Sequence, residues 1–129
     1  MWRIEETGPK SFLLVEDDNE VREFISDTLR ELGYGLIEAS DAEIALGLLD
    51  KHYVDLLLTD VVLPRMNGRQ LVDAARASNP TLKVLYMTGY SRNAIVHQGR
   101  LDPGVYLIQK PLTQSLLAEK IRAVLDQGL

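Results

Sequence analysis

Apolar residues along the chain gather into five short segments, and turn-forming or charged residues follow each of them. Short apolar segments that end in turn signals are typical of buried β-strands. We therefore expect strands at residues 11–15, 35–39, 55–59, 82–87 and 105–108. The third of these is apolar almost throughout, which is typical of a parallel strand covered on both faces.

Between these segments, apolar residues recur every three or four positions, the spacing of helices with one buried face. The first expected helix begins after a cap at Asn19 and ends at Gly33, and the second begins after a cap at Ser40 or Asp41 and ends at Leu49. The third follows the 64–68 turn and ends before Asn79-Pro80. The fourth covers residues 92–99, and the fifth begins after a cap at Thr113. Their expected inward residues include Val21, Phe24, Ile25, Leu29 and Leu32, then Ile44, Ala45, Leu48 and Leu49, then Leu71, Val72, Ala74 and Ala75, and finally Leu116, Leu117, Ile121, Val124 and Leu125.

Five strands that alternate with five helices predict a doubly wound α/β domain, with a parallel sheet, helices on both faces and right-handed crossovers. The length of 129 residues suits one domain. Residues 1–10 are mixed and polar, with Gly8-Pro9 near their end, so we interpret them as a tail or linker. The domain then occupies residues 11–129.

Composition narrows the function classes. The chain has 14 basic and 19 acidic residues, a net charge of −5 and no basic run, which argues against direct binding of nucleic acid. It has no cysteine, which excludes disulfides, thiolate metal sites and cysteine nucleophiles. No apolar run is long enough to cross a bilayer and no signal-peptide core is present, so we expect a cytoplasmic domain without membrane contact of its own.

Polar residues that can bind a ligand or take part in a reaction follow four of the five expected strands. Glu16-Asp17-Asp18 follow the first, Asp60 the third, Thr88 the fourth and Lys110 the fifth. Each has an ordinary explanation, because acidic residues often cap helices and such residues are common in turns. The carboxyl ends of parallel strands meet at one edge of the sheet, however, and ligands of open α/β sheets bind there. Four such positions, each at the carboxyl end of a different strand, therefore favour a single site.

Three carboxylates in one pocket repel each other unless one is protonated or a cation lies between them. Glu16, Asp17 and Asp60 offer oxygen ligands only, which favours Mg²⁺. A metal beside a free carboxylate oxygen suggests phosphoryl transfer onto Asp60. The Thr88 hydroxyl and the Lys110 ammonium are candidates to bind phosphoryl oxygens. Neither His52 nor His97 has a second histidine near it, so we expect no metal role for them.

Four motifs, in this order and spacing, resemble the receiver domain of two-component response regulators. They are Leu-Leu-Val-Glu-Asp-Asp at 13–18 with Arg22 downstream, Thr-Asp-Val-Val-Leu-Pro-Arg-Met-Asn-Gly at 59–68, Met-Thr-Gly-Tyr at 87–90, and Gln-Lys-Pro-Leu at 109–112. The resemblance covers about residues 11–126. It implies a flavodoxin-like (βα)5 fold with strand order 2-1-3-4-5.

The resemblance also implies the roles of the site residues. Asp60 is the implied phosphoacceptor, Thr88 the switch hydroxyl and Lys110 the site lysine, joined to Pro111 by a cis peptide bond. The implied Mg²⁺ ligands are Glu16, Asp17, Asp60 and the backbone carbonyl of Val62. The implied phosphoryl donor is a sensor histidine kinase or a histidine phosphotransfer domain. Such a domain is a phosphoacceptor that catalyses its own phosphorylation and dephosphorylation, rather than an enzyme with outside substrates.

This sequence departs from the family pattern at three positions. Glu16 is one methylene longer than the usual aspartate, which places its carboxylate behind a water. Leu107 stands at the position of the switch aromatic, with Tyr106 one place off on the opposite strand face. Leu112 stands where phenylalanine is usual. We expect Thr88 still to move on phosphorylation while tyrosine rotation is absent or muted. A weak homodimer through helix 92–99, strand 105–108 and the last helix is a further expectation.

Several alternatives remain open. Residues 66–71, 87–91 and 107–111, together with the linker-like first ten residues, resemble receivers fused to the C-terminus of hybrid sensor kinases; a free-standing single-domain regulator is the alternative. An aspartate-nucleophile phosphohydrolase normally needs a second acid close after the nucleophile, where this chain has Val62. A flavodoxin-like binding module needs a Gly-, Ser- or Thr-rich phosphate loop, where this chain has Glu16-Asp17-Asp18.

Overall fold

The computed structural model describes residues 10–89 and 103–126 of the chain. Five strands form one parallel sheet in the order β2-β1-β3-β4-β5, which confirms the predicted order. The strands are β1 (Ser11–Val15), β2 (Gly35–Ala39), β3 (Leu56–Asp60), β4 (Lys83–Thr88) and β5 (Val105–Gln109).

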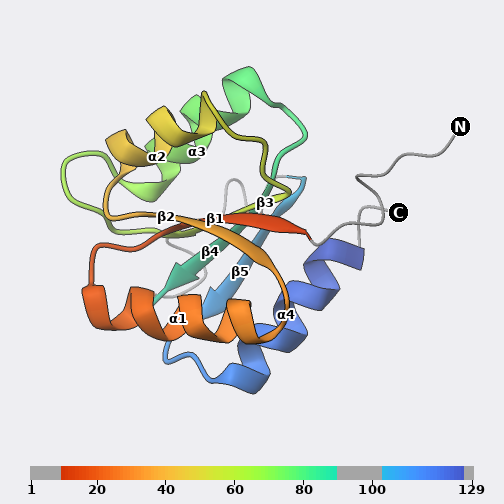
Figure 1. The fold of residues 1–129 in the computed structure, drawn as a ribbon. Helices are drawn as coiled ribbons and strands as arrows, with labels where there is room; N and C mark the ends of the chain where they lie inside the picture. The colour runs from red at the N-terminus through yellow and green to blue at the C-terminus, as the bar shows by residue number, and fades with distance from the viewer. Residues whose placement is uncertain (1–9, 90–102, 127–129) are drawn as a thin grey trace, which may run out of the picture.

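Helices cover both faces of this sheet, as Figure 1 shows. They are α1 (Asn19–Glu31), α2 (Ala42–Leu49), α3 (Gly68–Ser78) and α4 (Gln114–Asp126). The pair α2 and α3 lies on one face, and the pair α1 and α4 lies on the other (Figure 1). The helix expected over 92–99 falls outside the described residues. None of the described helices is long and apolar enough to cross a membrane.

The sheet separates two hydrophobic cores, and alternate residues of each central strand contribute to them. In β1, Leu13 packs into the core under α2 and α3, while Phe12 and Leu14 pack into the core under α1 and α4. All five residues of β3 are buried. Burying one such large apolar side chain contributes about 1.5–3 kcal/mol, so both faces of the central strands stabilise the fold. This explains why the sequence of β3 shows no alternation.

The helix starts agree with the predictions except at α1, where Asp18 rather than Asn19 is the cap. The Asp18 carboxylate accepts hydrogen bonds from the backbone N–H of Glu20 (2.9 Å) and Val21 (3.2 Å). Asn19 is already helical, and its side chain accepts from Arg22 instead. Asp41 caps α2, which settles the choice left open with Ser40.

Two strands begin one residue later than predicted. Asp55 precedes β3 rather than opening it; its carboxylate accepts a hydrogen bond from the Ser11 N–H (2.8 Å), and its own N–H donates to the Ser11 carbonyl (2.8 Å). These contacts join the starts of β1 and β3. β4 runs from Lys83 to Thr88, so the buried Leu82 stands just before it. β3, β4 and β5 also end one residue later than predicted, at Asp60, Thr88 and Gln109.

Five residues that the helical spacing placed on inward faces are exposed instead: Phe24, Leu32, Ile44, Ala74 and Leu116. Ile44 is 47% exposed because α2 buries Ala42 and Ala45 against the sheet, and a neighbouring helix position points about 100° away. Leu116 is 48% exposed for the same reason beside the buried Leu117. The apolar stripe of each helix is therefore narrower than its sequence indicates.

Candidate functional site

The carboxyl ends of β1, β3, β4 and β5 lie at one edge of the sheet, as the parallel topology requires. Asp60 is the last residue of β3 and Thr88 the last residue of β4, and both are buried. Glu16 comes one residue after β1 and Lys110 one residue after β5. The Lys110 N–H donates to the Thr88 carbonyl (2.8 Å), which extends the pairing of the two strands to the site.

Lys110 joins two of the acids directly. Its Nζ lies 2.6 Å from Asp60 Oδ2 and 3.2 Å from Glu16 Oε1. The second oxygen of each acid is held by the backbone, since Asp60 Oδ1 accepts from the Val62 N–H (3.1 Å) and Glu16 Oε2 from the Asp18 N–H (3.1 Å). Both carboxylates are therefore fixed in orientation, and the ammonium partly balances their charge.

Burial and like charge act on the protonation of Glu16. Its side chain is almost fully buried, and this burial, with a smaller contribution from the charge of Asp60, raises the pKa of Glu16 to about 7. The Asp18 hydrogen bond and Lys110 act in the opposite direction but do not outweigh burial. Burial also opposes the charged form of Lys110, yet contact with Asp60 and Glu16 leaves the pKa of Lys110 raised. At neutral pH Glu16 is therefore only partly ionised, and the Lys110 ammonium lies against both Glu16 and Asp60.

The donor set suits a hard divalent cation. Glu16, Asp17 and Asp60 each offer a carboxylate oxygen, and these oxygens lie within 4.8 Å of one another. Two of the acids are buried and Asp17 is exposed, so an ion here would have protein oxygens on one side and water on the other. Mg²⁺ prefers this combination of a few carboxylates and several waters. The residues present therefore fit the metal that the sequence predicts.

The structure brings the predicted site residues to one edge. Glu16, Asp17, Asp60 and Lys110 form one cluster, and Thr88 lies at the end of β4, which pairs with the strand of Asp60. Val62 stands beside Asp60, with its N–H on the Asp60 carboxylate. The peptide bond between Lys110 and Pro111 is cis, which confirms the prediction.

Arg22 supports the acidic residues in a way that the sequence analysis did not derive. Its Nη1 donates to the Glu16 carbonyl (2.7 Å), and its Nη2 donates to the Asn19 side chain (2.6 Å). Arg22 therefore fixes the turn that holds the acidic pair. The sequence signal was only the place of Arg22 in the family motif, because nothing local links residue 22 to residue 16.

Gly68 is a second supporting residue that the sequence analysis did not single out. A Cβ at this position would overlap the carbonyl oxygen of Asp60, and the Gly68 N–H donates to the Val61 carbonyl (2.8 Å). The start of α3 therefore packs against the backbone of the candidate phosphoacceptor. The only sequence signal was the Asn-Gly pair at the end of the 59–68 motif.

Replacing Gly68 with alanine is expected to destabilise the domain. The added methyl has no room beside Asp60, and overpacking of this kind costs about 1–3 kcal/mol. Gly47→Ala is the matched control, since nothing lies within 4 Å of a Cβ there and alanine favours a helix over glycine by up to about 1 kcal/mol. Urea unfolding of both variants and the wild type measures the two changes in the free energy of unfolding. Equal stability of Gly68→Ala and the wild type would show that the two backbones are not in contact.

Comparison with known proteins assigns the class of this fold and site. The sequence model of the response regulator receiver domain matches residues 12–122, and the chain therefore belongs to the receiver domain family of two-component systems. Receiver domains are phosphoacceptors that bind Mg²⁺ through acidic residues and interact with histidine kinases or phosphotransfer domains.

The relatives include both free-standing and fused receivers. The chain is 31% identical over 116 residues to the response regulator receiver protein CpdR of Brucella abortus, covering 90% of this chain and 97% of CpdR. It is 29% identical over 123 residues to the sensor kinase CckA of the same organism, covering 94% of this chain but 13% of CckA. The crystal structure of the receiver domain from hybrid histidine kinase CckA has a TM-score of 0.77 and 32% identity, covering 89% of this chain and 98% of that domain.

Proposed function

We propose that this domain accepts a phosphoryl group from a phosphohistidine onto Asp60. The observation that carries the proposal is the contact between Asp60 Oδ2 and Lys110 Nζ (2.6 Å) beside two further acids at the carboxyl edge of the sheet. An Asp60 oxygen attacks phosphorus while the bond from phosphorus to the histidine nitrogen breaks, and its electron pair stays on the imidazole. The product is an acyl phosphate on Asp60, which water later hydrolyses.

The residues around Asp60 have separate tasks in this proposal. Glu16, Asp17, Asp60 and the Val62 carbonyl would hold Mg²⁺, which would supply positive charge to offset that of the transferred group. Lys110 pairs with one phosphoryl oxygen through the ammonium that contacts Asp60 in the free domain. The Thr88 hydroxyl donates to another. The domain supplies positioning and charge, and the phosphoryl group comes from the partner.

Turnover of outside substrates is less well supported. A phosphohydrolase of the aspartate-nucleophile type needs an acid close after the nucleophile to protonate the leaving group. The corresponding side chain here is Val62, which is apolar and 52% exposed. We therefore propose a phosphoacceptor rather than an enzyme.

An apolar groove next to the site offers a place for the phosphohistidine donor. It has a volume of about 600 Å³ between α1 and the segment after β5, and its lining residues are Glu20, Val21, Phe24, Lys110, Pro111 and Leu112. Lys110 belongs to both the groove and the Asp60 cluster. A helical kinase or phosphotransfer domain seated on this groove would therefore present its histidine close to Asp60.

Replacing Phe24 with serine tests the groove. We expect the rate of transfer from a phosphorylated donor domain to fall roughly tenfold, because Phe24 is the one aromatic residue among those that line the groove, and loss of about 1.4 kcal/mol of contact energy weakens binding tenfold. Labelling by acetyl phosphate should be unchanged, since it needs only the Asp60 cluster. Leu32→Ser is the control, a similarly exposed residue at the end of α1 that does not line the groove. An unchanged rate of protein-to-protein transfer in Phe24→Ser would place the donor elsewhere.

We further propose that the domain functions as the cytoplasmic receiver of a hybrid sensor histidine kinase. The similarity to CckA and the linker-like composition of residues 1–10 support this context. The similarity to CpdR supports the alternative, a free-standing regulator, because the chain spans nearly all of that protein. The neighbouring coding sequence distinguishes them: a kinase domain fused upstream in the same reading frame supports the hybrid, and an upstream gene that is separate from this reading frame supports the regulator.

The rotation of an aromatic side chain on β5 that the resemblance implies is expected to be absent or small in this domain. Leu107 packs into the core under α2 and α3, while Tyr106 packs into the core under α1 and α4, as strand alternation predicts. We expect Thr88 to approach the phosphoryl group in a structure with beryllofluoride and Mg²⁺, while Tyr106 keeps its rotamer. A large rotation of Tyr106 coupled to movement of Thr88 would show that the switch survives in shifted register.

The weak homodimer remains a proposal. Its expected surface includes residues 92–99, which lie outside the described residues, together with β5 and α4. Leu116 supports it, because this leucine of α4 is 48% exposed.

A further inference from the structure

The loop between β3 and α3 contains a strained turn at Arg65. The backbone φ of Arg65 is +66°, in the left-handed region that residues other than glycine seldom adopt. The Met66 N–H donates to the Pro64 carbonyl (2.7 Å), so Arg65 is the central residue of a γ-turn with positive φ, the rare and strained form of this turn. Strained residues persist only where surrounding contacts hold them, and they gather at functional sites.

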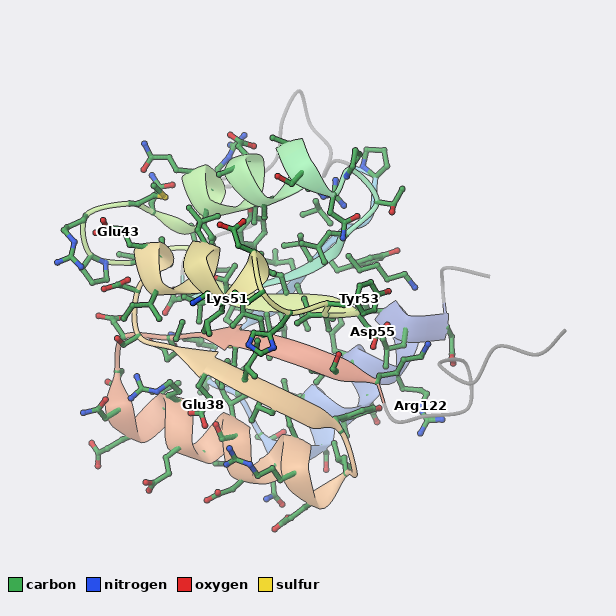
Figure 2. All side chains as sticks on the ribbon, turned by 45° about the horizontal axis from the view of Figure 1, so that its top comes forward. Glu38, Glu43, Lys51, Tyr53, Asp55 and Arg122 are labelled. Carbon is green, nitrogen blue, oxygen red and sulfur yellow. The ribbon has the colours of Figure 1, made fainter. Side chains whose placement is uncertain are left out.

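Two acids at the start of α2 hold the side chain of Arg65. Its Nη2 lies 2.7 Å from Asp41 Oδ2, and its Nε lies 3.2 Å from Glu43 Oε1. Figure 2 shows Glu43 beside this loop, and its side chain is 67% exposed, so its ion pair contributes little. Asp41 is only 14% exposed, and its other oxygen is fixed because it accepts from the Ile44 N–H (2.8 Å). The contact with Asp41 is therefore the stronger of the two, since water and salt screen it less.

The same loop contacts the candidate phosphoacceptor three residues before the turn. The Val62 N–H donates to Asp60 Oδ1 (3.1 Å), and the Val62 carbonyl is a proposed Mg²⁺ ligand. The loop closes on itself, because the Gly68 N–H donates to the Val61 carbonyl (2.8 Å). A rotation of Arg65 to an ordinary negative φ would have to be accommodated between these closed ends, where Val62 stands. The conformation at Arg65 and the position of Val62 are therefore linked.

We propose that Arg65 is a positioning residue for phosphoryl transfer to Asp60, an inference that rests on the proposed function. The contact with Asp41 offsets the strain of the γ-turn and so keeps the backbone of Val62 aligned with the Asp60 carboxylate. Arg65 acts through the backbone of the loop rather than by contact with the transferred group. The start of α2 is thereby part of the support of the site.

Two substitutions separate this backbone role from a role of the charge. Arg65→Gln removes the ion pairs but keeps a side chain that is strained at positive φ. We expect its rate of labelling with acetyl phosphate and Mg²⁺ to fall roughly tenfold, because small misplacements in a reacting site have effects of this size or larger. Arg65→Gly removes the same ion pairs, but glycine adopts positive φ without strain, so it should restore most of the lost rate. If Arg65 acted only by attracting an anionic donor or by stabilising α2, the two variants would be equally slow.

The amide resonance of Val62 gives a readout that needs neither metal nor phosphoryl donor. In ¹⁵N–¹H spectra of the metal-free domain, this resonance reports the hydrogen bond from Val62 to Asp60. It should shift in Arg65→Gln and return toward its wild-type position in Arg65→Gly. Arg30→Gln is the matched control, because it removes another surface ion pair, with Glu38 (3.0 Å), from a helix on the opposite face of the sheet. It should change neither the rate nor the resonance.

Equal labelling rates in the wild type and Arg65→Gln would overturn the proposal, and so would a Val62 resonance that Arg65→Gln leaves unmoved. Rates that fall equally in Arg65→Gln and Arg65→Gly would also overturn it. Failure of the proposed function is a different result, because the wild type itself would then gain no label on Asp60.

Circular dichroism checks that the variants are folded. If Arg65→Gln does not fold, Asp41→Asn replaces it, since asparagine still caps α2 but lacks the charge that Arg65 contacts. A slower labelling rate and a shifted Val62 resonance are expected in this variant. An unchanged rate with an unmoved resonance would overturn the proposal.

Discussion

Replacing Asp60 with asparagine is expected to abolish the phosphoryl adduct that the wild-type domain forms with acetyl phosphate and Mg²⁺. An amide oxygen is a poor nucleophile, and the variant also loses one of the three carboxylates that approach within 4.8 Å. Intact-mass spectrometry measures the adduct directly. Asp50→Asn, an exposed residue at the end of α2, is the control and should be phosphorylated like the wild type.

Loss of the adduct in Asp60→Asn is informative because asparagine has nearly the same size and shape as aspartate. Asparagine can still accept from the Val62 N–H through its side-chain oxygen, so the end of β3 should keep its geometry. A circular dichroism spectrum like that of the wild type would establish this. An adduct of unchanged yield in Asp60→Asn would mean that another residue is the acceptor.

Magnesium is expected to stabilise the wild-type domain strongly and the variant Asp17→Asn much less. A ligand that only the folded state binds adds about 1.4 kcal/mol at ten times its Kd, and loss of a carboxylate ligand weakens the binding. The effect on the wild type should be greater at pH 8 than at pH 6, because the pKa of Glu16 is raised to about 7 and a carboxylate ligand must lose its proton. Thermal unfolding with and without millimolar MgCl₂ measures this.

Without metal, the Glu16 carboxyl should make the free energy of unfolding fall as the pH rises. The pKa of Glu16 is about 7 in the folded domain, above its ordinary value of 4.5, so the folded state keeps a proton that the unfolded state has lost. Stability therefore decreases from about pH 4.5 to about pH 7 through this group and is level above that. Glu16→Gln should remove this part of the profile, with the exposed Glu31→Gln as control. A Tm indifferent to Mg²⁺, or a Glu16→Gln profile like that of the wild type, would contradict this account of the pocket.

The parallel sheet and the shared edge of its site residues could be predicted from local signals, whereas the strand order 2-1-3-4-5 was implied by the resemblance to receiver domains. Each strand is a short apolar segment, and the alternation with helices leaves few topologies. Once the strands are parallel, residues that follow them must share an edge, which is why Lys110 and Asp60 meet although 50 residues separate them. The cluster with Glu16 follows from the same argument.

What the sequence could not predict depends on tertiary contacts or on choices between chemically similar neighbours. Asp18 and Asn19 are both good caps, and only the backbone conformation decides between them. The exposure of Ile44 and Leu116 depends on how far each helix rotates against the sheet. The contact of Gly68 with the Asp60 backbone, and the bond from Arg22 to the Glu16 carbonyl, join residues that no local pattern links.

The most direct test of the central claim is to locate the phosphoryl group chemically. Borohydride reduces an aspartyl phosphate to homoserine, so the acceptor is marked by a change in residue mass after labelling with acetyl phosphate and Mg²⁺. The account predicts homoserine at position 60, and only there, in the peptides sequenced by mass spectrometry. Reduction at Glu16, Asp17 or Asp18 with Asp60 unmodified would contradict it.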